Sequence, residues 1–65
     1  MTFGEKIRQL RQKESLTIKD LAAKSGLTAV TIISYEKNRS KANVTNIRKL
    51  ANALNCEYED LFELR

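Results

Sequence analysis

Apolar residues recur three or four positions apart along most of this chain, and that spacing predicts helices rather than strands. Phe3, Ile7 and Leu10 show it first, which predicts a helix from residue 3 to about residue 13. Four further segments repeat the pattern, at residues 18–25, 28–37, 43–55 and 58–64. Because strand-like runs are few, we expect an all-α chain of five helices.

The predicted helices begin and end at residues suited to those positions. Thr2 with Glu5, and Thr17 with Asp20, match the capping box, in which a hydroxyl and a carboxylate each accept a hydrogen bond from a free backbone N–H group at the helix start. Single capping residues precede the next two helices, at Thr28 and Asn43. We expect left-handed backbone at the residues that end three helices, Gly26, Asn38 and Asn55.

Composition supports the same fold class. The chain has 65 residues, two glycines and no proline, which favours helices and a single domain over residues 1–65. The expected core consists of Phe3, Ile7, Leu10, Leu16, Leu21, Ala22, Leu27, Ile32, Ile47, Leu50, Ala51, Leu54 and Leu61. We expect Cys56 to be a small buried apolar residue rather than a redox switch.

The most informative segment is residues 17–37, where two short predicted helices flank Gly26. Ala22 lies four residues before this glycine, and so small a residue lets the second helix cross close to the first. Ile32 and Tyr35 follow the glycine by six and nine residues, on one face that can pack back onto the first helix. These offsets predict a helix-turn-helix, although other helical hairpins share them.

A wider pattern surrounds this motif and is carried by residues 3, 7–11, 16–17, 21–22, 25–28, 31–32, 35–39, 50–51, 53–54 and 61–62. With these residues the chain resembles the lambda-repressor-like, Cro-type (XRE-like) helix-turn-helix domains over nearly its whole length. The resemblance implies a compact five-helix lambda-repressor-like domain whose second and third helices form the helix-turn-helix, the third lying in the DNA major groove. It also implies sequence-specific binding of double-stranded DNA by a transcription regulator, usually a repressor, of bacterial, phage or mobile-element origin.

The third helix is expected to present side chains to base edges. If Ile32 and Tyr35 face the protein, helical geometry turns residues 29, 30, 33 and 34 to the opposite, outward face. The residues predicted to face the bases are Thr28, Ala29, Val30, Ile33 and Ser34. Their apolar members suit thymine methyl groups, and no Gln, Asn or Arg is present for bidentate hydrogen bonds. We therefore expect methyl contacts and DNA shape to set specificity at A/T-containing half-sites; the alternative for Ile33 is packing against a loop or a partner.

Basic residues are concentrated in one part of the chain. Residues 1–49 hold eleven of the twelve Lys and Arg and four of the eight acids, a net charge of +7, whereas residues 50–65 carry −3. Such a basic surface suits a polyanion or serves solubility alone. The residues expected to bind DNA phosphates are Thr17, Lys19, Lys37, Asn38, Arg39, Ser40, Lys41 and Asn43. Those expected to be solvated surface are Lys6, Arg8, Lys13 and Lys24.

One position departs from the family that the chain resembles. Ile18 begins the second predicted helix, where the family usually has a glutamine that binds phosphate and supports the recognition helix. The departure puts that phosphate contact in doubt. The resemblance also implies an ion pair between Arg11 and Glu36, which would join the first helix to the end of the third.

The acidic C-terminal segment has more large apolar residues than one small core needs. Its candidate dimer residues are Tyr58, Phe62 and Leu64. Operators read by this motif are commonly palindromic, so we expect a homodimer on double-stranded DNA. A frayed tail is the alternative interpretation of this segment.

Other function classes find little support in the residues present. One cysteine and no histidine exclude an internal disulfide, a Cys/His zinc site and Ser-His-Asp catalysis. We expect no metal, cofactor, small-molecule ligand or membrane segment, and no enzymatic activity, in a cytoplasmic protein. The alternative function is a protein-interaction module or antitoxin-like component that retains the fold. The choice among phage repressor, restriction–modification controller and antitoxin stays open.

Overall fold

The computed structural model describes residues 1–65, which form five helices and no strand. The helices are α1 (Phe3–Lys13), α2 (Ile18–Ser25), α3 (Ala29–Glu36), α4 (Val44–Leu54) and α5 (Tyr58–Phe62). The predicted all-α class is confirmed. Helices α3 and α4 are each two residues shorter than predicted, and so is α5. It ends at Phe62 rather than Leu64, because the Leu64 N–H donates to Leu61 O in a tighter turn.

The predicted capping boxes are present at the first two helix starts. Thr2 Oγ1 accepts from the Glu5 N–H at 3.1 Å, and Glu5 Oε1 accepts from the Thr2 N–H at 2.8 Å. Thr17 and Asp20 repeat both hydrogen bonds, each at 3.0 Å. Since the ionised carboxylate accepts the backbone N–H of its threonine, the pKa of Glu5 and that of Asp20 lie below their ordinary values.

Left-handed residues end the helices as predicted, with one addition. Gly26, Asn38 and Asn55 have φ angles of 77°, 56° and 55°. Ser15, with φ 57°, was not predicted. Its N–H donates to Gln12 O and the next N–H donates to Arg11 O, the Schellman arrangement that closes a helix. Serine seldom occupies this backbone region, so the residue type did not predict a left-handed conformation here.

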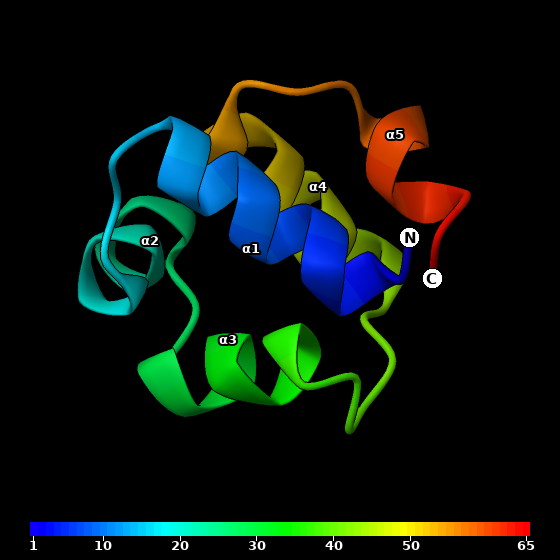
Figure 1. Cartoon of the computed structure of the whole chain (residues 1–65), viewed down its shortest axis with the longest axis horizontal. Helices are drawn as coiled ribbons and strands as arrows, with labels where there is room; N and C mark the ends of the chain where they lie inside the picture. The colour runs from blue at the N-terminus through cyan, green and yellow to red at the C-terminus, as the bar shows by residue number, and fades with distance from the viewer.

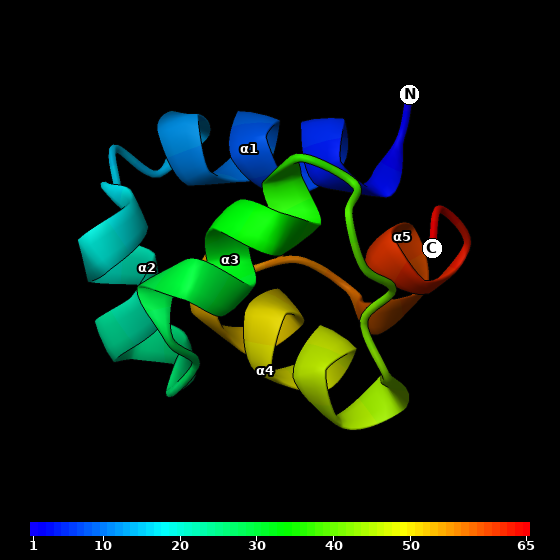
Figure 2. The ribbon, with the colours of Figure 1, turned by 90° about the horizontal axis from the view of Figure 1, so that it is seen from below.

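Each helix packs on at least two others, and α5 packs on both α4 and α1. Helix α1 packs on α3, α2 packs on α3 and α4, and α4 packs on α5. Figure 1 shows α2 and α5 at opposite sides of the molecule, with both termini beside α5. In Figure 2, α3 crosses the middle of the view between α1 and α4, and no other helix lies over it. None of the five helices has the length and apolar character needed to cross a membrane.

The buried core joins all five helices. Its twelve apolar members are Phe3, Ile7, Leu21, Ile32, Tyr35, Ala42, Ile47, Leu50, Ala51, Ala53, Leu54 and Leu61. Ala42 and Ala53 were not expected there. Four expected core residues instead pack at its partly exposed edge, namely Leu10, Leu16, Ala22 and Leu27. Cys56 was expected to be buried and is only partly so, also at this edge. A 65-residue domain has too small an interior to enclose every apolar side chain.

Helices α1 and α3 meet closely at Gly4. A Cβ atom at this residue would lie 2.4 Å from the carbonyl oxygen of Tyr35 and 2.5 Å from that of Glu36. Beside it, the Phe3 ring meets the Tyr35 ring edge-on, with centroids 5.9 Å apart. The start of α1 is therefore seated directly on the C-terminal end of α3.

We expect Gly4→Ala to lower the melting temperature. The added methyl group meets backbone oxygens that cannot rotate away, and such overpacking costs about 2–3 kcal/mol. That exceeds the roughly 1 kcal/mol by which alanine favours a helix over glycine. Thermal unfolding followed by circular dichroism measures the effect, with Gln9→Ala on the exposed side of α1 as control. Equal melting temperatures for the two variants would contradict the close approach.

Candidate nucleic-acid interface

One face of α3 is apolar and open to solvent. Ile32 and Tyr35 anchor the opposite face in the core, at 0% and 5% exposure. Val30 is 76% exposed, more than any other large apolar side chain of the chain. Ala29, Ile33 and Ser34 lie on the same outward face and are half-buried. The outward face of α3 therefore combines one highly exposed apolar side chain with three half-buried neighbours.

Thr28 caps the start of α3 as predicted, and its hydroxyl group is also hydrogen-bonded to that of Thr31. Thr28 Oγ1 accepts from the Thr31 N–H at 3.2 Å and donates to Thr31 Oγ1 at 2.9 Å. Thr28 is thus occupied as a cap, and the Thr31 hydroxyl proton is the donor that remains free. Thr31 was not among the predicted contact residues, although a threonine three residues after a threonine cap is the pattern that produces this pair.

The loop after α3 is folded back against the helix. Ser34 and Ser40 hydroxyl groups are hydrogen-bonded at 2.8 Å, and the Arg39 N–H donates to Ser34 O at 2.9 Å. Two residues expected to contact different parts of DNA, a base and a phosphate, are therefore joined. The bond holds the loop in one position relative to α3.

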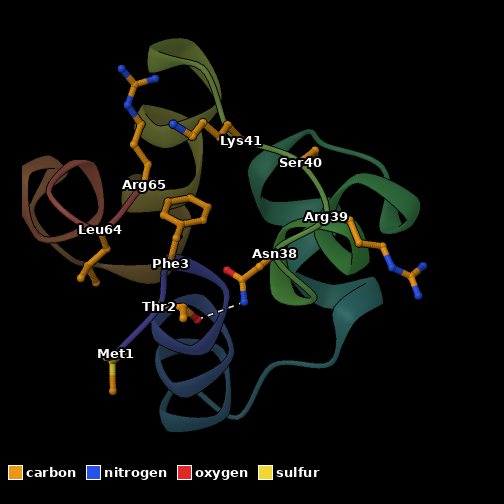
Figure 3. A pocket seen from close by; sticks show the side chains of 9 residues that line it. All are labelled: Met1, Thr2, Phe3, Asn38, Arg39, Ser40, Lys41, Leu64 and Arg65. Atoms are coloured by element: carbon orange, nitrogen blue, oxygen red, sulfur yellow. Dashed lines mark hydrogen bonds between the residues drawn. The ribbon is translucent and has the colours of Figure 1, made fainter.

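Three cations of this loop are free of acidic partners. Lys37, Arg39 and Lys41 are exposed, and the only ion pair in the chain joins Arg11 and Glu36. Figure 3 shows the Arg39 and Lys41 side chains extending to different sides of the loop. Unpaired cations spread in this way suit a long anion rather than a single small one.

Asn38 lies among these cations, but its side chain is hydrogen-bonded to the start of α1. Its Oδ1 accepts from the Gly4 N–H at 2.9 Å, and its Nδ2 donates to Thr2 Oγ1 at 3.0 Å (Figure 3). Its side-chain amide therefore completes the cap of α1. Asn43, another expected phosphate contact, differs because only its Oδ1 is engaged, by the Asn46 N–H at 2.8 Å.

The helix starts differ in their suitability for anions. At α2, where Thr17 and Lys19 were expected to bind phosphate, the Asp20 carboxylate already accepts the Thr17 N–H. At α4, which begins after Asn43, no acidic residue lies in the first turn. Free N–H groups at a helix start attract anions, so α4 offers the stronger field.

Arg11 and Glu36 form a bidentate pair across the helices. Arg11 Nε lies 2.7 Å from Glu36 Oε2, and Nη2 lies 3.1 Å from Oε1. The remaining Nη1 donates to Leu16 O at 2.9 Å. Both side chains are largely buried, at 12% and 8% exposure. The hydrogen bonds that Arg11 donates to the Glu36 carboxylate raise the pKa of Arg11, and the pair ties α1 to the last turn of α3.

The C-terminal surface carries a stacked aromatic pair. The Tyr58 and Phe62 rings are 5.2 Å apart, with the Arg48 guanidinium 4.7 Å from the first ring and that of Arg65 4.8 Å from the second. Phe62 is 39% exposed, whereas Tyr58 and Leu64 pack partly against the core. Among the three candidate dimer residues, Phe62 thus presents the most apolar surface.

Cys56 lies between this surface and α1. Burial raises the pKa of its thiol, and neighbouring acids add to that effect. The raised pKa keeps the sulfur protonated and a poor nucleophile near neutral pH.

Residues 7–61 match the family model for helix-turn-helix proteins, so the chain belongs to the helix-turn-helix family. Its five-helix arrangement is that of a lambda-repressor-like domain. The chain is 41% identical over 61 residues to the HTH-type transcriptional repressor RghR of Bacillus subtilis (strain 168). That alignment covers 92% of this chain but only 45% of RghR.

Two solved structures are similar along most of their length. The restriction-modification controller protein C.AhdI from Aeromonas hydrophila superimposes with a TM-score of 0.87 at 37% identity, covering 92% of this chain and 91% of that one. The P22 c2 repressor, solved in complex with synthetic operator 9T, gives a TM-score of 0.88 at 30% identity, covering 94% and 92%. Two of the curated relatives are longer than these structures. The chain spans less than half the length of RghR and of a second transcriptional regulator of Bacillus subtilis, RghRB.

Glu36→Ala should destabilise the protein by about 2–3 kcal/mol, because it leaves the Arg11 guanidinium largely buried without its partner. Thermal melting measures the loss. Glu63→Ala removes an exposed acid at the end of α5 and serves as control, with an expected change below about 0.5 kcal/mol. A Glu36→Ala melting temperature equal to that of the protein itself would reject the structural role of the pair.

Asn38→Gly should also destabilise, and Asn55→Gly is its matched control. Both residues have left-handed backbone, which glycine retains. Asn38 loses two hydrogen bonds to α1, worth about 1–2 kcal/mol together, whereas Asn55 loses one exposed bond to Glu14. Denaturant unfolding of the two variants compares them. Equal losses would mean that the Asn38 amide contributes no more to stability than the exposed Asn55–Glu14 bond.

Proposed function

We propose that this chain binds double-stranded DNA with α3 in the major groove and regulates transcription as a repressor. The observation that carries the proposal is the open apolar face of α3, bordered by a loop with three unpaired cations. A major groove about 12 Å wide admits one helix with its side chains. RghR is named as a transcriptional repressor and the P22 c2 repressor is solved on an operator, which supports the same use of this fold.

Base reading in this proposal depends on methyl contacts. Val30 is the principal contact because it is the most exposed residue of the face. The remaining base-facing residues are Thr28, Ala29, Ile33 and Ser34, with Thr31 added as a free hydroxyl donor. Apolar side chains in the major groove recognise the thymine C5 methyl group. We infer that the half-site contains A/T pairs beneath the centre of α3.

Backbone binding fixes the register of α3 on the duplex. The loop cations Lys37, Arg39 and Lys41 supply charge, and the open start of α4 at Asn43 supplies N–H groups. The ammonium group of Lys19 and the hydroxyl groups of Thr17 and Ser40 complete the proposed set. Asn38 contributes by holding the loop against α1 through its side-chain amide rather than by binding a phosphate itself.

A homodimer on a palindromic operator fits the dimensions of the domain. Half-sites one helical turn apart lie about 34 Å from centre to centre, so α3 must sit about 17 Å from the two-fold axis. The domain is 24 Å across its longest axis, so the axis must run along a side remote from the helix-turn-helix. Helix α5 lies on the side opposite α2 (Figure 1), which supports a dimer contact made by Phe62 with Tyr58 and Leu64 beside it.

The open face of α3 also favours a second function, binding of another protein through Val30 and its neighbours. The two functions differ in their response to salt. A protein contact made by apolar side chains weakens little as salt rises, whereas DNA binding weakens steeply because counterions are released.

Fluorescence anisotropy with a duplex selected from random DNA tests the proposal. Three loop cations predict a slope of about −2.7 or steeper in log affinity against log salt. Arg39→Gln should reduce that slope by about 0.9. Absence of binding to any selected duplex at low salt would reject DNA binding and favour the protein-interaction function.

Val30→Ala tests the methyl contact in a double-mutant cycle. The variant should weaken operator binding about tenfold, because about two buried methylene equivalents are lost. Replacing the contacted thymine by uracil removes only the methyl group and should have a similar effect. The two changes should not add, since they delete opposite sides of one contact. Additive losses would show that Val30 does not touch that methyl group.

A further inference from the structure

A shallow hollow of about 220 Å³ lies where α1, α2 and α3 meet, beside the open face of α3. Its lining consists of Arg8, Arg11, Ile18, Ile33, Glu36 and Lys37. Three of these residues, Ile33, Glu36 and Lys37, belong to α3 or to the turn that follows it. The hollow therefore adjoins the surface that would face a duplex. Arg8 of α1, which was expected to be solvated surface, also lines it.

The charge in this hollow is positive and uncompensated. Arg11 and Glu36 neutralise each other, and both carboxylate oxygens of Glu36 already accept hydrogen bonds from Arg11. Arg8 and Lys37 have no acidic partner within ion-pair distance. Both are exposed, so their guanidinium and ammonium groups can meet an anion without breaking any contact within the protein.

Helical geometry explains why Arg8 reaches this place. It lies four residues after Gly4 and three before Arg11, so the three residues share one face of α1. Gly4 touches the end of α3 and Arg11 pairs with Glu36 there. The face of α1 that docks on α3 thus carries Arg8 to the edge of the helix-turn-helix.

The apolar part of the lining comes from Ile18 and Ile33. Ile18 occupies the first position of α2, where the family usually has a glutamine that binds phosphate. An isoleucine side chain cannot donate a hydrogen bond, so a phosphate near this position must be bound by other residues. DNA backbone presents both kinds of surface together, because each phosphate adjoins a deoxyribose whose carbon-bound hydrogens are apolar.

We infer that this hollow holds a segment of the DNA backbone, with one phosphate bound by Arg8 and Lys37 and the adjoining sugar against Ile18 and Ile33. Helix α1 then supplies the phosphate contact that the start of α2 cannot make. Ile33 becomes a backbone contact rather than a reader of bases. The inference rests on the proposed DNA binding and adds α1 to the surface that performs it.

Arg8→Gln tests the inference, with Lys6→Gln as a control of equal charge change. Lys6 is on the same helix but lies toward Cys56, away from α3. We expect Arg8→Gln to weaken binding about five- to tenfold and to reduce the salt slope by about 0.9. The same fold loss should appear on a scrambled duplex, since phosphate contacts carry no sequence information. Lys6→Gln should change neither quantity, and Arg8→Lys should retain most of the affinity.

Ethylation interference locates the contact on the selected duplex. For the wild-type chain, ethylation of one additional backbone phosphate per half-site should inhibit binding, and that inhibition should vanish with Arg8→Gln. If Arg8→Gln behaves as Lys6→Gln while Arg39→Gln weakens binding, the hollow is no part of the interface and the DNA-binding proposal stands. If no duplex is bound at low salt, both proposals fall together.

Discussion

The seating of α1 on the last turn of α3 is the constraint on which the rest of the structure depends. Gly4 brings the two backbones into contact, and the Arg11–Glu36 pair holds the same end of α3 from the other end of α1. An eight-residue helix is marginal in water by itself, so its direction is set by what it packs against. Because both of these contacts lie at the C-terminal end of α3, Val30 near its start is left exposed on the outward face.

The segment that follows α3 divides its residues between two tasks. Glu36 and Asn38 turn inward and bond to α1, whereas Lys37, Arg39 and Lys41 remain exposed and unpaired. The left-handed turn at Asn38 separates the two groups, because it reverses the chain and sends successive side chains in different directions. Structural support and positive charge therefore occupy neighbouring positions without competing for the same atoms.

Much of the candidate site follows from periodicity. Once Ile32 and Tyr35 are assigned to the core, a helix of 3.6 residues per turn leaves Val30 on the opposite face, and the structure places it there. Ile33 is the informative exception. Its position in the helix predicted an outward side chain, with packing against a loop or a partner as the alternative. In the structure it lines a hollow together with Ile18 and Arg8, which periodicity within α3 does not describe.

The helix starts, both capping boxes and the left-handed residues Gly26, Asn38 and Asn55 could be predicted from the amino-acid sequence, because these interactions join residues within a few positions of one another. The resemblance to a known family supplied the Arg11–Glu36 pair. Only the tertiary structure decided the Asn38–Thr2 bond, the burial of Ala42 and Ala53, and the place of Arg8 beside α3. Those features depend on how closely separate helices approach, and no local pattern of hydrophobic and polar residues encodes that distance.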